Sequence, residues 1–387
     1  MRILIVPMPA MAPTAGPFSR ARLLAEAFLA KGFSVALCAA EDVNTLPIPG
    51  VPNYFLSVPV PFGLPEGIGL RAFSLAEKLG LPGKKPVRSF EEVLHFTGAT
   101  AYSYFRKSVS EIRSAIAAFQ PDLIYSEFNL SAIAAANAER KLVFASYSYP
   151  AQPSYAASPQ FARGVRRALT ELHQPPVRSA LELFLRADLR IVPSIRELEP
   201  IEGENTVFAG TLKKAPEPRE PGEKSLILAY LGTGTISKKQ MLNEISDAFA
   251  DSGFEVYLAG MEPECSRCRN IHTDRKFDFS VLLPRAAVFL NHGGQNSIAD
   301  GLLCGVPQLI YPGKVFERQY NAESVVKNKA GIRLAEGEFT AQKLRESVRA
   351  LTSDGSFREN SIWLGKLLTV PGGTDAVIRS ILERIPG

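Results

Sequence analysis

The sequence predicts an α/β protein that consists of two parallel-sheet domains in tandem. Its 387 residues suit two large domains. Short apolar runs alternate with segments of helical period over residues 1–196, and the same alternation restarts at residue 224. Residues 197–223, between these two regions, are rich in proline and charge, which indicates an interdomain connection.

The first half opens with an apolar run at residues 2–7, an amphipathic stretch that Gly32 ends, and a second apolar run at 33–40. A strand, a helix and a strand in this order form a βαβ unit, which implies parallel strands. The pattern recurs at residues 122–128, 131–141 and 142–148. Residues 1–196 are therefore expected to form one domain.

The second half, residues 224–369, repeats this order. Apolar runs at 225–232, 255–260, 287–292 and 307–311 predict strands, and stretches at 239–253, 296–304 and 318–330 predict helices. We expect the last segment, 370–387, to form a helix that packs back on the first domain. Two such domains place a ligand cleft between the carboxyl ends of their strands.

Charge and cysteine content exclude several classes of protein. The net charge of +5 is far below the dense basic stripe of a nucleic-acid binder and suits an anionic small ligand. No apolar run reaches the ~20 residues that span a bilayer, and no signal peptide is recognised, so we expect a cytoplasmic protein. Cys265, Cys268 and His272 have ligand-like spacing, but the second pair of a zinc site is missing. We therefore predict a loop there and no metal site.

The most informative stretch is residues 289–322. A buried strand ends at His292, Gly293 and Gly294, and Asn296 and Ser297 then open a helix as N-cap residues. Glycines let backbone amides approach a ligand, and the helix N-terminus adds partial positive charge, so this loop suits a phosphate or diphosphate. A purely structural strand-to-helix turn is the alternative.

Several motifs around this loop occur at matching spacing. They are His292-Gly-Gly-x-Asn-Ser, Asp300, Gly305-Val-Pro, Pro312, Asn321-Ala, Leu-Leu-Pro at 282–284, LGTGT at 231–235 and PDLIYSE at 121–127. Together they resemble the nucleotide-sugar signature of the UDP-glycosyltransferases that modify small molecules, members of the GT-B superfamily. The resemblance implies two Rossmann-like domains facing each other across a cleft, with the nucleotide sugar held mainly by the second and the acceptor by the first.

The resemblance also implies roles for individual residues. His292 would contact the diphosphate, and Gly293, Gly294, Asn296 and Ser297 would complete the cradle. Asp300 stands where the family places an acid that binds the ribose. The remaining candidates for the phosphate, sugar and base are Thr233, Thr235, Phe277 and Phe279, of which the two phenylalanines are equally well explained as core residues.

Two departures from the family pattern affect the chemistry. The family's catalytic histidine lies in a Gly-His-x-x-Pro loop, and here Gly16 and Pro17 occupy its first two places. The aspartate that orients that histidine is replaced by Glu127. Glu127 is therefore a candidate general base, directly or through a water; an acidic acceptor that needs little help, or His95 as base, are the alternatives.

The second departure is at the sugar end. Where the family carries an Asp-Gln pair, this chain has Glu317 and Arg318. Arg318 adds a fixed cation that would suit a carboxylated sugar or reach a phosphate, unless it pairs with Glu317. Gln319 takes the glutamine's role if the loop is shifted by one residue.

The acceptor side is less informative. Residues 146–161 interleave tyrosines, among them Tyr147 and Tyr149, with small residues and prolines, as in a cleft loop for an aromatic acceptor. The next stretch carries Arg163, Arg166 and Arg167, a pattern that suits a solvated helix face better than contact with anionic lipid.

The sequence therefore predicts an inverting, metal-independent glycosyltransferase. It would move a sugar from UDP or dTDP to a small, largely apolar acceptor, without a cofactor beyond that co-substrate, as a monomer or homodimer. Because the histidine is missing, a non-catalytic nucleotide-sugar-binding protein or partner subunit is the alternative.

Overall fold

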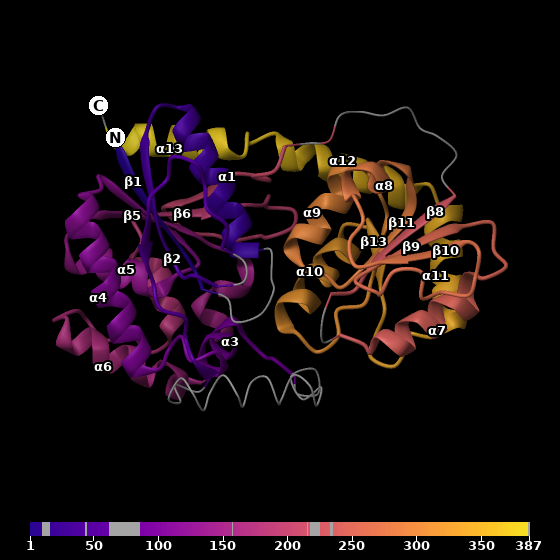
Figure 1. Ribbon diagram of the computed structural model, residues 1–387, viewed down its shortest axis with the longest axis horizontal. Coiled ribbons are helices and arrows are strands. Elements are labelled where there is room, and N and C mark those ends of the chain that lie inside the picture. Colours follow the sequence, from indigo (N-terminus) through magenta and orange to yellow (C-terminus); the bar gives the residue numbers. More distant parts are fainter. Residues whose placement is uncertain are drawn as a thin grey trace.

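The protein has two α/β lobes, which lie side by side in the computed structural model (Figure 1). The structure describes residues 1–9, 16–42, 45–61, 86–156, 158–214, 216, 225–232 and 235–385. Within these residues each lobe is built on one parallel sheet, with strand order β3-β2-β1-β4-β5-β6-β7 in the first and β10-β9-β8-β11-β12-β13 in the second. This confirms the predicted fold class.

The central strands of the first sheet are buried on both faces because helices cover both. One face packs on α4, whose buried Phe105, Val109, Ile112 and Ile116 recur at helical spacing. The other face packs on α1 and α13. The strands are β1 (Arg2–Pro7), β2 (Ser34–Ala39), β3 (Asn53–Phe55), β4 (Leu123–Glu127), β5 (Leu142–Ser146), β6 (Leu189–Val192) and β7 (Thr206–Phe208), and the helices are α1 (Gly16–Ala30), α3 (Phe90–Phe96), α4 (Tyr102–Phe119), α5 (Leu130–Ala138) and α6 (Arg163–Glu171).

The second lobe repeats this design around β8 and β11, which pair at its centre. Its strands are β8 (Leu226–Tyr230), β9 (Glu255–Ala259), β10 (Ile271–Asp274), β11 (Ala286–Asn291), β12 (Gln308–Ile310) and β13 (Gly331–Arg333). Its helices are α7 (Lys238–Phe249), α8 (Phe279–Leu282), α9 (Gln295–Leu303), α10 (Phe316–Lys327), α11 (Ala341–Ser353) and α12 (Ser356–Thr369). Among the described helices none is long and apolar enough to cross a membrane.

The predicted connection contributes a strand. β7 lies inside residues 197–223 and pairs with β6, so the first sheet extends further along the chain than residue 196. The run TVFAG at residues 206–210 looks strand-like in the sequence, and the structure confirms a strand there, although it is only half-buried. As an edge strand, β7 needs less apolar character than a central one.

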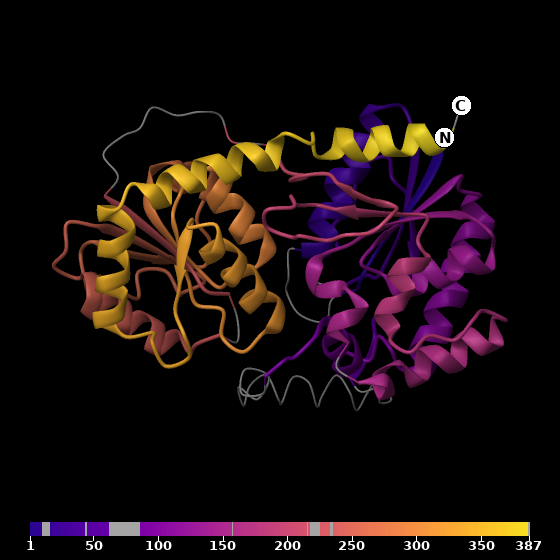
Figure 2. The same cartoon turned by 180° about the vertical axis from the view of Figure 1, so that it is seen from behind.

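Among the described residues, two segments that run between the lobes lie next to each other. The first crossing follows β7, and the second joins α12 to α13 (Thr374–Arg384), which returns to the first lobe beside α1 (Figure 2). The amide of Thr211 donates to the Leu368 carbonyl at 2.9 Å, and that of Gly373 donates to the Ala209 carbonyl at 2.7 Å. A Cβ on Gly210 would stand 2.3 Å from the Leu368 oxygen, so the two crossings are in close backbone contact.

The lobes also contact each other directly. Val87 of the first lobe and Val315 form a parallel bridge, in which the Val87 amide donates to the Lys314 carbonyl and the Phe316 amide to the Val87 carbonyl, each at 3.0 Å. The Tyr149 ring stacks on the Tyr320 ring, with centroids 4.4 Å apart and planes 9° apart. The start of α10 is therefore held by the first lobe.

Candidate functional site

The loop between β11 and α9 forms a tightly packed cradle. Asn291, buried at the end of β11, accepts the Gly293 amide at 2.8 Å and donates to Gln308 at 2.8 Å. Gly293 has φ +81°, and a Cβ there would stand 2.7 Å from the Arg318 carbonyl oxygen. Only glycine combines this conformation with so close an approach of α10. Asn321 of α10 donates to the Gly293 carbonyl at 2.8 Å and holds the loop from the same side.

The helix behind this loop begins one residue earlier than expected. Gly294 is the N-cap of α9, with φ −67° and ψ 140°, and no side chain caps the helix. Asn296 and Ser297 lie inside the first turn, so the prediction that they are N-caps was wrong. Because the N-cap side chain is only a hydrogen, the first-turn amides lack a side-chain acceptor and can receive an anion.

His292 lies beside these amides as a neutral imidazole. Its Nδ1 is 3.4 Å from the Tyr230 carbonyl oxygen, and the Tyr230 ring meets it edge-on with centroids 5.5 Å apart. A carbonyl only accepts, so we assign the proton to Nδ1, which leaves Nε2 as the free nitrogen. Burial, and secondarily the charge of Arg318, lowers the pKa of His292 to about 4.

Arg318 places a cation next to this imidazole. Its Nη1 donates to Thr235 Oγ1 at 2.8 Å, and burial lowers its pKa from the usual value. Within the described residues Arg318 forms no ion pair, and the neighbouring Glu317 is exposed. Arg318 and the α9 N-terminus therefore give this site positive charge beside the neutral His292, and among the described residues no carboxylate forms an ion pair with Arg318.

Two other candidates, Gln319 for the sugar and Asp300 for the ribose, already have hydrogen-bond partners within the protein. Gln319 donates its Nε2 to the Gly313 carbonyl at 3.0 Å, which commits that amide to the loop. Thr233 lies outside the described residues. Asp300 accepts Lys213 Nζ on both oxygens, at 2.6 and 2.8 Å, so a ribose would compete with this lysine for the carboxylate. Burial raises the pKa of Asp300, and Lys213 opposes that shift.

The two predicted base-stacking residues lie at the edge of an aromatic cluster. Phe277 meets Tyr257 edge-on at 5.3 Å, and Phe279 meets Tyr230 and Phe289 at 5.8 and 5.9 Å. Both are half-buried. The cluster joins Phe279 to His292 through Tyr230, and base stacking by either phenylalanine stays a prediction.

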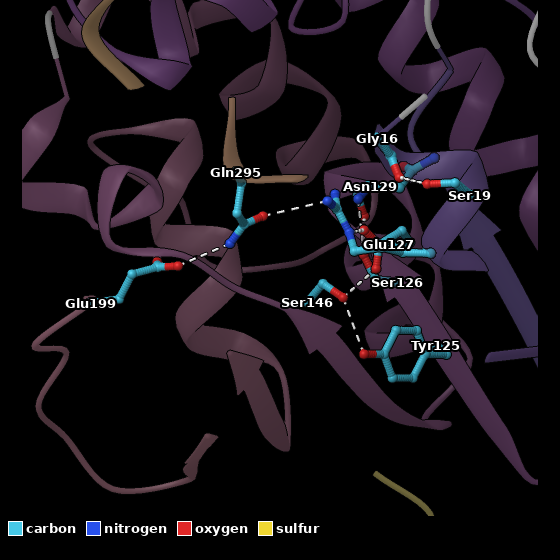
Figure 3. Close-up of polar contacts among 10 residues, drawn as sticks. Gly16, Ser19, Tyr125, Ser126, Glu127, Asn129, Ser146, Glu199 and Gln295 are labelled. Atoms are coloured by element: carbon cyan, nitrogen blue, oxygen red, sulfur yellow. Dashed lines mark hydrogen bonds and ion pairs between the residues drawn. The ribbon is translucent and has the colours of Figure 1, made fainter. Parts of the chain in front are cut away.

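Glu127, the predicted base, is fully buried at the end of β4 (Figure 3). Its Oε1 accepts Arg20 Nε at 2.5 Å, and its Oε2 accepts the Ser146 hydroxyl, which also contacts the Tyr125 hydroxyl at 3.1 Å. Each oxygen thus has a partner inside the protein. In this arrangement Glu127 anchors Arg20 and presents no free oxygen to an acceptor.

The predicted alternative base, His95, packs against a neighbour. Its ring stacks on Phe161 with centroids 4.4 Å apart, and burial lowers its pKa. Tyr147 was also misplaced by the sequence: it is 2 % exposed and packs on Phe184, 5.5 Å between centroids, in the core rather than at the cleft. Tyr149 does reach the boundary between lobes, where it stacks on Tyr320.

Pro17 occupies the first turn of α1, which begins at Gly16, as expected from its fixed φ and missing amide. Arg20 follows one turn later, at the place of the proline in the Gly-His-x-x-Pro pattern. Sequence reasoning missed it, although the pattern held the signal: a cation stands where the family has an apolar residue. Its side chain is 12 % exposed and lies over the Phe128 ring, 5.2 Å to the centroid.

Gln295 and Glu199 were also missed. The Gln295 side chain lies between Glu199 and the group around Glu127 (Figure 3). Its Oε1 accepts Arg20 Nη1 at 3.4 Å, and its Nε2 donates to Glu199 Oε1 at 2.9 Å. Glu199 is 3 % exposed, and its Oε2 accepts the Tyr149 amide at 2.6 Å. Burial raises the pKa of Glu199 to about 7.

The remaining sequence candidates have local roles. Among the described residues no group of three His, Cys, Asp or Glu side chains is placed to hold a metal ion. His272 pairs with Glu255 at 2.6 Å, and Cys265 is exposed. In α6, Arg166 donates to the Pro159 carbonyl at 2.8 Å, and Arg167 lies over the Tyr102 ring.

Parts of this chain are similar in sequence to known proteins. Residues 262–379 match the C-terminal domain of the erythromycin biosynthesis protein CIII-like family. An uncharacterized UDP-glucosyltransferase of Bacillus subtilis (strain 168) is 27 % identical over 55 % of this chain and 56 % of its own length. The aclacinomycin-T 2-deoxy-L-fucose transferase of Streptomyces galilaeus is 27 % identical over 43 % of this chain and 39 % of its own. The matches thus span only part of these relatives.

Solved structures resemble the whole chain. The glycotransferase of kitacinnamycin superposes with a TM-score of 0.76 at 18 % identity, covering 100 % of this chain and 99 % of that one. CalG4, the calicheamicin glycosyltransferase, does so with a TM-score of 0.74 at 16 % identity and the same coverage. At these identities the likeness shows the fold, which is GT-B.

Proposed function

We propose that this chain, whose fold is GT-B, is an inverting glycosyltransferase that uses a UDP- or dTDP-sugar. The observation that carries the proposal is the cradle of the second lobe. There the α9 N-terminus and the neutral His292 lie around the loop at Gly293 with Arg318, which forms no ion pair within the part of the chain that the structure describes. A diphosphate supplies the negative charge that this arrangement lacks.

The reaction follows from where charge develops. The acceptor oxygen attacks the anomeric carbon, the bond from that carbon to the diphosphate oxygen breaks, and its electron pair stays on the leaving nucleotide. The acceptor proton is released to water. Donors fixed on the diphosphate bind this growing charge more tightly than the ground state, so Arg318 and the helix amides accelerate departure. We propose that they serve in place of a divalent metal.

The contacts of Glu127 and His95 in the first lobe favour an acceptor that loses its proton readily, without a strong general base. Glu127 is buried with both oxygens bonded, and His95 stacks on Phe161. A phenol loses its proton far more readily than an aliphatic alcohol. Tyr149, which stacks at the boundary between the lobes, suits an aromatic acceptor. We therefore propose a small phenolic or polycyclic acceptor.

Arg318 bears on the choice of sugar. It replaces the glutamine that reads sugar hydroxyls in the family and, among the described residues, has no carboxylate partner. A carboxylated sugar would supply that partner directly, whereas a neutral sugar would leave Arg318 to the diphosphate. Arg318→Gln separates these readings, because it restores the family's residue and removes the cation.

The experiment is a panel of UDP-glucose, UDP-glucuronate and dTDP-glucose, each with and without 4-methylumbelliferone as a phenolic acceptor. Product formation, free nucleotide and the effect of EDTA are measured for the wild-type protein and Arg318→Gln. We expect nucleotide release that depends on the phenol and withstands EDTA. If no donor is consumed while UDP still raises the melting temperature, the protein is a non-catalytic nucleotide-sugar binder.

A further inference from the structure

Gln295 joins the second lobe to two charged groups outside it. It is the first residue of α9 and directly follows the cradle glycines. Its backbone amide belongs to the helix start that faces the diphosphate site, while its side chain reaches Arg20 of the first lobe and Glu199 of the connection. One residue therefore touches both the cradle and the first lobe (Figure 3).

The carboxamide of Gln295 has one orientation that satisfies both partners. A guanidinium only donates, so it requires the Gln295 oxygen, and a carboxylate only accepts, so it requires the Gln295 nitrogen. A flipped amide would set its NH₂ against Arg20 and its oxygen against Glu199. The two contacts therefore require the same orientation of the amide, and the charge of Arg20 strengthens its contact with the Gln295 oxygen.

Both partners are themselves fixed. Arg20 is held by Glu127 Oε1 at 2.5 Å and by the Phe128 ring. Glu199 is buried and accepts the Tyr149 amide at 2.6 Å. A displacement of the first lobe relative to α9 would therefore break a contact of Gln295, since neither partner is free to follow it.

We propose that Gln295 is a positioning residue that aligns the acceptor-binding lobe with the diphosphate cradle. This inference rests on the proposed function and specifies how the two halves of its site are brought into register. The cradle binds nucleotide through backbone amides and the side chains of His292 and Arg318, none of which needs the Gln295 carboxamide. Loss of the carboxamide would therefore spare nucleotide binding and impair transfer to the acceptor.

Gln295→Met tests the proposal, because methionine keeps the length of the side chain and removes both hydrogen-bonding groups. Gln342→Met is the matched control: Gln342 also donates its Nε2 to a glutamate, Glu346, at 2.9 Å, but on the exposed face of α11. Transfer from UDP-glucose to 4-methylumbelliferone, donor hydrolysis, UDP affinity by calorimetry and amide hydrogen exchange are measured for both variants.

For Gln295→Met we expect kcat for transfer to fall about tenfold, because the contacts with Arg20 and Glu199 are lost. The ratio of hydrolysis to transfer rises, and the Kd for UDP stays within about twofold. Exchange in residues 147–152 accelerates about tenfold, because Gln295 no longer holds Glu199 against the Tyr149 amide. Gln342→Met changes none of these quantities.

A second variant separates the two contacts. Gln295→Glu keeps an oxygen acceptor for Arg20 and sets a carboxylate against Glu199, near which Glu317, Tyr149 and Tyr320 are the other titratable groups. Transfer should be impaired at pH 8, where both carboxylates are ionised, and recover in part at pH 6, where Glu199 is protonated and can donate. Gln295→Met has no such recovery.

Three results would overturn the proposal. Unchanged exchange at residues 147–152 in Gln295→Met would show that Gln295 does not hold Glu199. Accelerated exchange with wild-type transfer would show a contact without a role in alignment. A wild-type protein that consumes no donor would remove the proposed function itself, which the exchange measurement distinguishes from a failure of the Gln295 contact.

Discussion

The close approach of α10 to the cradle can be tested with a matched pair of substitutions. Gly293 and Gly337 have nearly equal φ angles, +81° and +84°. A Cβ on Gly337 would meet nothing within 4 Å, whereas one on Gly293 would stand 2.7 Å from the Arg318 carbonyl oxygen and 3.2 Å from Ile310 Cγ2. Substituting alanine at each position separates the conformational cost from the cost of the contact.

The size of the effect follows from these distances. A left-handed conformation costs alanine about 1–2 kcal/mol in either variant. Gly293→Ala must also push Arg318 away, and such overpacking costs about 1–3 kcal/mol more. A cradle displaced from α10 loses a charge-assisted hydrogen bond to the diphosphate, about 1.5–3 kcal/mol, or roughly tenfold to a hundredfold in affinity.

Urea unfolding and calorimetric titration with UDP measure both quantities. We expect Gly293→Ala to be less stable than Gly337→Ala and to bind UDP at least about tenfold more weakly. Gly337→Ala should bind UDP like the wild-type protein. Equal stability and equal UDP affinity in the two variants would refute the close approach of α10 as the reason for glycine at position 293.

Three further predictions concern the charged groups. A diphosphate favours the protonated imidazole, and a proton taken up on Nε2 makes His292 a donor to the developing charge, so His292→Ala should lower transfer about a hundredfold; unchanged donor kinetics would exclude His292 from the site. Glu127→Gln leaves the Arg20 cation uncompensated and should lower the free energy of unfolding by about 3–5 kcal/mol, with little change in UDP affinity; a wild-type urea midpoint would contradict this. The raised pKa of Glu199, about 7 against an ordinary 4.5, means that the folded protein binds the extra proton and loses stability as pH rises through this window. Glu199→Gln should therefore gain up to about 3 kcal/mol relative to wild type above pH 7 and nothing below pH 4.5; parallel stability curves would rule this out.

The parts of the site that depend on local sequence were predictable. A buried strand that runs into His292 and two glycines fixes a strand-to-helix turn, whatever the rest of the chain does. The fold class was predictable for the same reason, since alternating apolar and amphipathic segments imply parallel βα units. The helix start was placed one residue late because Asn296 and Ser297 are good caps in general, and only the backbone shows that Gly294 is the cap here.

The contacts that join distant segments were not predictable. Arg20, Gln295 and Glu199 meet only because the two lobes pack against each other, and no sequence spacing encodes that meeting. Tyr147 was misassigned because an aromatic-rich loop does not reveal which ring turns toward the core. Glu127 looked like an available base because its partner, Arg20, is 107 residues away in the chain.

The paired crossings between the lobes set what kind of motion the protein can make. The two crossing segments, residues 209–211 and 368–373, are hydrogen-bonded to each other and together form a hinge between the lobes. Sliding or twisting of one lobe on the other would break the backbone hydrogen bonds between these segments, whereas rotation about the hinge would preserve them. A small bend at the crossings would displace contacts farther from them, such as the stacked rings of Tyr149 and Tyr320, by more than it displaces the crossings themselves.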